Sequence, residues 1–174
     1  MSDLKLIALD TEDLSVISAH LQDAVVRIAD MTYLPKEQRF AVVANRFNWA
    51  KALDHSAGKK SVAQIERRRA GLRFERVLAA KVHGLDLKDK RSSLALLAIT
   101  FEASAGPAAA DGTDGRDERD GPDGREGPDG HVTLTFSGGA AIRLSVECVE
   151  AELKDLGAAW SAARSPVHPE DEKL

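Results

Sequence analysis

The feature that most restricts the fold of this chain is an alternating stretch between residues 132 and 148. Apolar residues occupy every second position on both sides of Ser137-Gly138-Gly139, with mostly polar residues between them. A repeat of two with one polar face is typical of antiparallel strands that bury one side. Neighbouring glycines supply the positive φ values that a short hairpin turn needs. The sequence therefore predicts a β-hairpin, whose inward residues are Val132, Leu134 and Phe136 before the turn and Ile142, Leu144, Val146 and Cys148 after it.

The spacing of apolar residues changes after this hairpin. Val149, Leu153 and Leu156 lie three or four positions apart, which is the spacing of one face of a helix. Gly157 follows where a left-handed residue commonly ends a helix. The sequence predicts a C-terminal helix over about 149–156, with Trp160 as an anchor to the core.

The N-terminal part of the chain has the pattern of a strand, a helix and a second hairpin. Residues 4–9 are strongly apolar, and residues 11–24 place apolar side chains at helical spacing behind an acidic first turn. Residues 25–33 and 39–49 are rich in strand formers, and Pro35 between them favours a turn. We expect these two stretches to pair.

Two further strands are predicted before the glycine-rich middle of the chain. Residues 67–83 read as one strand, with Arg76 on the same face as its apolar side chains. An inward arginine needs a partner, a bulge or a water-filled site, because an unpaired buried charge is costly. Residues 94–102 are almost continuously apolar, as in a central strand covered on both faces.

These elements predict an α+β domain. Its sheet would be curved and mostly antiparallel, with about six or seven strands, an N-terminal helix after the first strand and a C-terminal helix packed on one face. A helix-grip-like sheet and a half-open barrel capped by the C-terminal helix both satisfy this order of elements.

Residues 104–130 interrupt that domain with a segment of low complexity. Glycine recurs at every third position over much of it, and eight acidic residues outnumber three basic ones. The segment is too short and too poor in proline for a collagen triple helix, and its acids lack the spacing of an EF-hand loop. The sequence predicts one domain over 1–164, interrupted by a disordered acidic loop at 104–130 and followed by a flexible tail at 165–174.

Composition and cysteine content bear on the compartment. The chain has no apolar run of 18 residues, the N-terminus lacks the pattern of a secretion signal, and the single cysteine excludes an internal disulfide. We therefore expect a cytoplasmic protein that does not enter a membrane.

Much of the chain resembles a bacterial family, known mainly from alphaproteobacteria, that is described only as a domain of unknown function. The resemblance rests on residues 4–49, 67–86, 94–102 and 132–157. It implies a shared fold and a cytoplasmic setting, but no activity. It also implies that 104–130 is an insertion, because this segment is longer than the usual connection at that place.

No stretch carries a catalytic or metal-binding signature. Cys148 follows the inward alternation of its strand and has no neighbouring histidine or helix start that would lower its pKa. The five histidines lack metal-ligand spacing. We therefore predict no catalytic residue, no metal and no cofactor, and favour a protein that is not an enzyme.

Three functional hypotheses remain open. The first is a non-enzymatic binding or assembly domain, either a homodimer or bound to a protein partner. The second is RNA or single-stranded nucleic acid, held by arginines and aromatic residues on the basic strands. The third is a small-ligand receptor or enzyme with a pocket near Arg76. The candidate ligand-binding residues are Arg46, Trp49, Arg68, Arg73 and Arg76.

Overall fold

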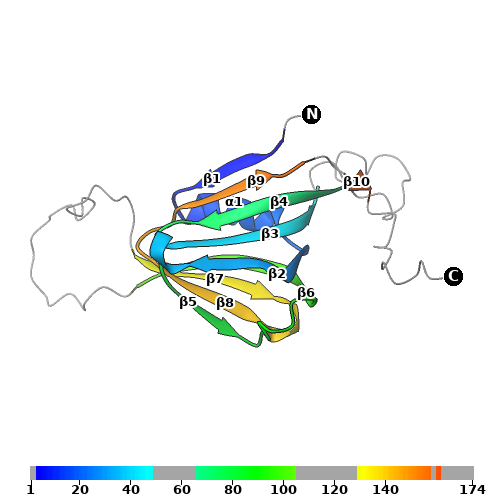
Figure 1. Cartoon of the computed structure of the whole chain (residues 1–174). Coiled ribbons are helices and arrows are strands. Elements are labelled where there is room, and N and C mark those ends of the chain that lie inside the picture. Colours follow the sequence, from blue (N-terminus) through cyan, green and yellow to red (C-terminus); the bar gives the residue numbers. More distant parts are fainter. Residues whose placement is uncertain (1–2, 49–65, 105–128, 158–159, 162–174) are drawn as a thin grey trace, which may run out of the picture.

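The computed structural model describes residues 3–48, 66–104, 129–157 and 160–161 (Figure 1). Within them, ten strands form one sheet and one α-helix packs against it. The strands are β1 (Lys5–Ala8), β2 (Ala24–Leu34), β3 (Arg39–Phe47), β4 (Glu66–Phe74), β5 (Val77–His83), β6 (Ser93–Ala103), β7 (Gly130–Phe136), β8 (Ala141–Val146), β9 (Ala151–Asp155) and β10 (Trp160–Ser161). The helix is α1 (Thr11–His20), and η1 (Pro35–Glu37) and η3 (Ser137–Gly139) are single 3-10 turns.

The sheet is antiparallel throughout its described pairs and has two halves. Its order is β1-β9-β4-β3-β2-β6-β7-β8-β5, and β10 pairs with the start of β4. The first half is β1-β9-β4-β3-β2, and the second half is β6-β7-β8-β5. Two connections cross from one half to the other, and backbone hydrogen bonds join them: Glu75 N to Glu150 O at 2.9 Å and Glu147 N to Arg76 O at 3.1 Å.

Helix α1 and one face of the sheet enclose the core. The side chain of Asp10 caps the helix by accepting from Asp13 N at 2.8 Å. Leu14 and Ile17 are buried against the sheet, and Ile99 N of β6 donates to Ser18 Oγ at 2.9 Å. We call the sheet face that α1 covers the inner face. The opposite face is the outer face, and Figure 1 looks onto it over β1, β9, β4 and β3, with α1 behind β9 and β4.

The predicted β-hairpin is confirmed. β7 and β8 pair from Gly130↔Val146 to Thr135↔Ala141, and Gly138 and Gly139 in the turn have φ values of +75° and +77°. Cys148 is buried, as its alternation predicts. The N-terminal strand, the following helix and the antiparallel pair of β2 and β3 are also present.

The predicted C-terminal helix, and with it the α+β class, is wrong. Residues 151–155 form β9, which pairs with β1 on one side and β4 on the other. Ala151, Leu153 and Asp155 point inward, so the stretch has the repeat of a strand. A helix there would leave the backbone groups of β1 and β4 without these partners. The helix-grip-like and half-open-barrel alternatives also required that helix.

The single strand predicted over 67–83 is also wrong, as is the count of six or seven strands. The stretch divides into β4 and β5, which lie in different halves of the sheet. Arg76 lies between them with a φ of +58°, a left-handed conformation that turns the chain. No glycine or proline marks this turn, so the strand-like alternation of apolar residues continues across it and the sequence does not show the break.

The remaining predictions about organisation fall on residues outside those described. These are most of the segment 104–130 and the tail 165–174, together with the side chain of Trp160. Ser104 N donates to Asp129 O at 2.9 Å, so the described residues on either side of 105–128 lie side by side.

Deleting residues 108–128 is expected to preserve the fold, because the hydrogen bond between Ser104 and Asp129 closes the base of this connection independently of its length. Each halving of a loop lowers its closure cost by about 0.6 kcal/mol, so we expect a gain in stability of at most about 2 kcal/mol. Denaturant unfolding of the deletion variant measures this change. A loss of the cooperative transition would show that the segment is structural.

Candidate functional site

Three charged side chains are buried at one end of the inner face. They are Arg46 on β3, Arg68 on β4 and Asp155 on β9, with exposed fractions of 3%, 6% and 3%. They lie together because Arg46 is opposite Arg68 in the sheet, and Ala70, two residues after Arg68, is opposite Asp155. We call these three residues the buried charge cluster.

Asp155 is the centre of this cluster. Arg46 donates to it through two parallel hydrogen bonds, Nε to Oδ1 and Nη2 to Oδ2, both at 2.8 Å. The backbone amide of Leu4 donates to Oδ2 at 3.0 Å. The paired geometry is the strongest form of arginine–carboxylate contact. Asp155 therefore links β3 and β9 to the N-terminal segment.

Arg68 connects the cluster to the acidic residues around it. Its Nη1 lies 3.7 Å from Asp155 Oδ2 and 3.0 Å from Asp3 Oδ1. Its Nε donates to Glu66 Oε1 at 3.1 Å. The hydrogen bond to Glu66 is the main reason why the pKa of Arg68 is raised. Both buried arginines thus have carboxylate partners.

The electrostatics of the cluster favour fixed protonation states. Burial alone would raise the pKa of Asp155, but the bonds from Arg46 and from the Leu4 amide, with the charges of Arg46 and Arg68, hold it below its usual value. The pKa of His20 is lowered by burial first and then by Arg46, against an opposing effect of Asp155. Asp155 is therefore a weak base, and the geometry suits holding strands together rather than transferring protons.

The lowered pKa of His20 predicts that stability falls on mild acidification. The folded chain binds fewer protons at His20 than the unfolded chain, so this contribution is complete above the unfolded pKa of about 6.5 and is lost as the pH falls through the folded pKa. We expect the thermal midpoint of the native chain to fall more between pH 7.5 and 5 than that of His20→Gln. Scanning calorimetry of both proteins measures the difference, and equal slopes would contradict the prediction.

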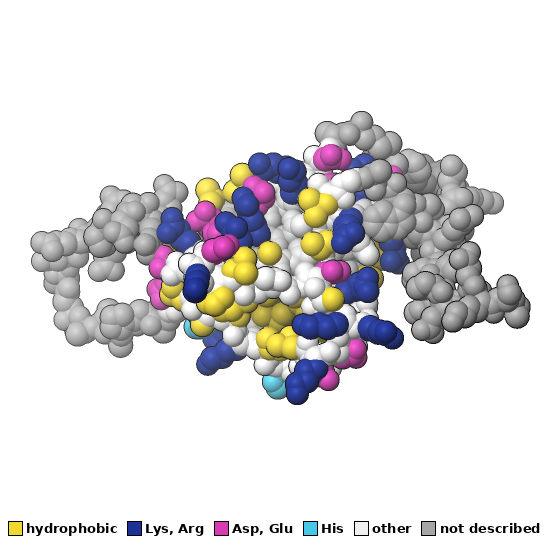
Figure 2. Space-filling view, in the orientation of Figure 1, with side chains coloured by type: hydrophobic (Ala, Val, Ile, Leu, Met, Phe, Trp, Pro, Cys, Tyr) yellow, Lys and Arg dark blue, Asp and Glu magenta, His cyan; other side chains and the backbone are white. Residues whose placement is uncertain are grey.

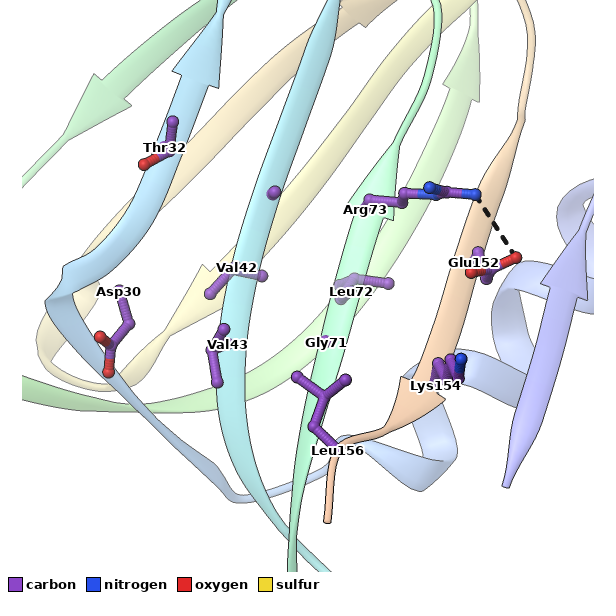
Figure 3. Close-up of a pocket in the computed structure, with 11 residues that line it drawn as sticks. Asp30, Thr32, Val42, Val43, Gly71, Leu72, Arg73, Glu152, Lys154 and Leu156 are labelled. Atoms are coloured by element: carbon purple, nitrogen blue, oxygen red, sulfur yellow. Dashed lines mark ion pairs between the residues drawn. The ribbon is translucent and has the colours of Figure 1, made fainter. Parts of the chain in front are cut away.

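The outer face of the first half carries a hollow of about 320 Å³ (Figure 3). Its floor is apolar and includes Ala41 and Val43 of β3, with Leu156 after β9. Its rim is polar, with Asp30 and Thr32 of β2 on one side and residues of β4 and β9 on the other. The full lining is Asp30, Thr32, Ala41, Val42, Val43, Gly71, Leu72, Arg73, Glu152, Lys154 and Leu156.

Small residues in a row of larger ones create this hollow. Gly71 of β4 is opposite Val43 on one side and Lys154 on the other, and it adds no side chain between them. A methyl group at Gly71 would lie 3.2 Å from Leu156 Cδ1, so Leu156 already fills part of the space above the glycine. Ala41, the next small residue, is flanked by Thr32 and Arg73.

The rim combines ion pairs with exposed basic groups. Arg73 Nη2 lies 3.5 Å from Glu152 Oε2, and Lys5 Nζ lies at the same distance from that oxygen. The side chain of Arg73 is nevertheless 48% exposed. Lys154 and Arg69 are exposed, and neither forms an ion pair with another described residue. Figure 2 shows this face, with basic side chains around patches of apolar ones.

Of the five predicted ligand-binding residues, the structure describes four, and these lie at three separate places. Arg46 and Arg68 belong to the buried charge cluster, whereas Arg73 is on the rim of the hollow. Arg76 lies in the turn between β4 and β5, where its Nε donates to Glu150 Oε2 at 3.0 Å. It does not line the hollow. Trp49 lies outside the described residues.

Sequence reasoning missed Asp155 and most of the hollow. The apolar stripe of the predicted helix does not include Asp155, whereas the alternation that Asp155 shares with inward Ala151 and Leu153 places it in the core. The signal for the hollow was Gly71, since an isolated glycine inside a strand often marks a close approach or a missing side chain.

The part of the chain that the structure describes contains no group of three or more His, Cys, Asp or Glu residues able to hold a metal ion. It also contains no helix long and apolar enough to cross a membrane.

Comparison with known proteins identifies a family. A search of curated proteins and a search of solved structures each found no match. The family model described as "Protein of unknown function (DUF2948)" matches residues 4–111 and 122–168, leaving out 112–121 inside the glycine-rich segment. The match covers most of the chain, including β1 to β9 and the residues of the buried charge cluster and the hollow, and the chain therefore belongs to the DUF2948 family.

Proposed function

We propose that this chain is a non-enzymatic binding domain that recognises a protein partner through the outer face of the first half. The observation that carries the proposal is the hollow, an apolar depression with a charged rim on an open sheet surface. Protein interfaces concentrate their binding energy in such places, where an anchoring side chain enters a pocket surrounded by polar groups.

The division of charged residues between the two faces supports this proposal. On the inner face Arg46, Arg68 and Asp155 contact one another and stabilise the fold. On the outer face Arg73 and Lys154 flank the apolar floor and are accessible to a partner. The single buried cysteine suits the reducing cytoplasm, which we propose as the compartment.

Photo-crosslinking tests the proposal. A photoreactive phenylalanine analogue at Thr32 of β2 lies on the exposed rim and leaves the floor of the hollow open, and the same group at Thr133 of β7 lies on the outer face of the second half. After irradiation in the native host, we expect a discrete protein adduct from position 32 and none from position 133. Equal adducts from both positions, or none from position 32, would refute the proposal. Mass spectrometry of the adduct distinguishes a second copy of this chain from another protein.

Nucleic-acid binding is a second candidate because of one observation on β4. Arg67, Arg69 and Arg73 alternate along its outer face, and the guanidinium of Arg67 lies 4.4 Å from the ring centroid of Phe47. Such a line of cations beside an aromatic ring resembles a single-strand binding surface. A gel shift with single-stranded RNA at 50 mM salt, lost in Arg69→Glu/Arg73→Glu, would favour this candidate. The absence of a shift under these conditions would exclude it.

A further inference from the structure

We infer that the partner presents an acidic polypeptide segment with an aliphatic side chain, which enters the hollow while its carboxylates contact the basic rim. This inference rests on the proposed function and specifies its partner. It follows from three features of the outer face: the sign of its charge, the chemistry of the floor of the hollow and the carboxylates on the rim.

Along β1, β9 and β4 the outer face is basic, although the whole chain is acidic. The chain has a net charge of −4. By contrast, the charged residues that alternate outward from β1, β9 and β4 are five basic and one acidic. They are Lys5, Arg67, Arg69, Arg73, Lys154 and Glu152. A local excess of positive charge on an acidic protein attracts acidic partners and orients them.

The floor of the hollow selects an aliphatic anchor. Ala41, Val43 and Leu156 provide apolar surface, and no aromatic residue is among those that line the hollow. Leu156 is 42% exposed, so a partner side chain in the hollow would cover it. Removal of this apolar area from water stabilises the complex by about 25 cal/mol per Å² before the costs of association.

The rim favours a polypeptide over a nucleic acid. Asp30 and Glu152 line the hollow, and their carboxylates repel any anion. A peptide can donate hydrogen bonds to them from its backbone amides, whereas every unit of a nucleic-acid backbone carries a phosphate. The ring of Phe47 is covered on one side by the guanidinium of Arg67, which leaves less of it for stacking on a base. An acidic peptide satisfies both the basic residues and these acceptors.

Selection from a random peptide library tests the inference. The full-length chain is used to select 12-residue peptides at 50 mM salt, and selected peptides and a 12-nucleotide single-stranded RNA are measured by fluorescence anisotropy. We expect acidic peptides with at least one Leu, Ile or Val, bound more tightly than the RNA. Their affinity should fall at least tenfold in Arg69→Glu/Lys154→Glu and should decrease as salt rises. Lys81→Glu/Arg143→Glu, an exposed double change on β5 and β8 in the second half that alters the charge by the same amount, is the matched control and should have no effect.

Ala41→Leu separates the anchor from the charges, because the larger side chain fills the hollow without changing the rim. We expect it to weaken the acidic peptides at least tenfold while circular dichroism and the thermal midpoint stay close to those of the native chain. Neutral or basic peptides whose binding is lost in Ala41→Leu would overturn the inference and leave the proposed function standing. Tighter binding of the RNA, or acidic peptides insensitive to both variants, would also overturn it. A crosslink from position 32 together with no selected peptide would contradict the acidic segment but would leave the proposed function standing.

Discussion

Replacement of Asp155 by alanine is expected to lower the free energy of unfolding by about 3–5 kcal/mol. The change removes the carboxylate that binds Arg46 through two hydrogen bonds and lies 3.7 Å from Arg68. Both arginines are buried, so their charges would lose this compensation away from water. The backbone amide of Leu4 would also lose its acceptor. Urea unfolding of the native and variant chains measures the loss.

Glu152→Ala is the matched control for this prediction. Glu152 lies on the same strand but points outward, and its ion pairs with Arg73 and Lys5 are partly exposed. Exposed pairs contribute about 0–1 kcal/mol, so the control should lose little stability. Equal losses in Asp155→Ala and Glu152→Ala would contradict a structural role for the buried charge cluster.

A double replacement, Arg46→Met/Asp155→Leu, removes the whole ion pair. It separates the net contribution of the pair to the free energy of unfolding from the loss caused by leaving one charge without its partner. An apolar pair of similar size leaves no charge at position 46, while Arg68 keeps Glu66 and Asp3 as partners. We expect this variant to be more stable than Asp155→Ala, because replacing a whole buried ion pair is often near neutral.

The stability of the native chain should also depend on pH through Asp155. The contribution of Asp155 is present above a pH of about 4 and is lost below it, because its pKa is lowered in the fold.

Gly130→Ala is expected to cost about 3 kcal/mol, the upper part of the range for overpacked sites. A Cβ atom at this position would overlap the backbone oxygen of Glu102 and approach Phe101 Cε2 to 2.7 Å. Neither contact is with the end of a flexible side chain that can swing away, because one is backbone and the other is a ring packed against the core. The first residue of β7 must therefore be glycine for β6 and β7 to pair.

Gly138→Ala provides the comparison, because at Gly138 a side chain has space but the backbone conformation is unfavourable, whereas at Gly130 the space is lacking. Nothing lies within 4 Å of a Cβ at Gly138, but its φ of +75° disfavours any other residue by about 1–2 kcal/mol. Thermal unfolding should rank Gly130→Ala as clearly less stable than Gly138→Ala. The reverse order would mean that β6 can move away from β7 at little cost.

Much of the sheet could be predicted because its strands carry their own local signals. In β7 and β8 the alternation and the two turn glycines specify the same hairpin, so the local sequence alone predicts it without knowledge of tertiary contacts. The stretch 149–157 differs, because its few apolar residues fit helical spacing and strand alternation equally well. The strand form is favoured because it hydrogen-bonds to the edges of β1 and β4, and those strands are far away in the sequence.

The candidate site was less predictable for related reasons. Alternation separates Arg68 from Arg67 and Arg69 and could have assigned them to opposite faces, but it does not identify which face is buried. Asp155 becomes the partner of Arg46 only once β9 is known to be a strand beside β4. The break at Arg76 carries no glycine or proline, so the separation of β4 from β5 depends on contacts between the two halves of the sheet.

The most direct test of the binding surface is an amide chemical-shift map of the full-length chain titrated with a peptide from the selection. We predict the largest shifts at Ala41, Val43, Gly71 and Lys154, in the floor and rim of the hollow, with small shifts in β7 and β8. Shifts concentrated in the second half of the sheet, or around the buried charge cluster, would contradict the account.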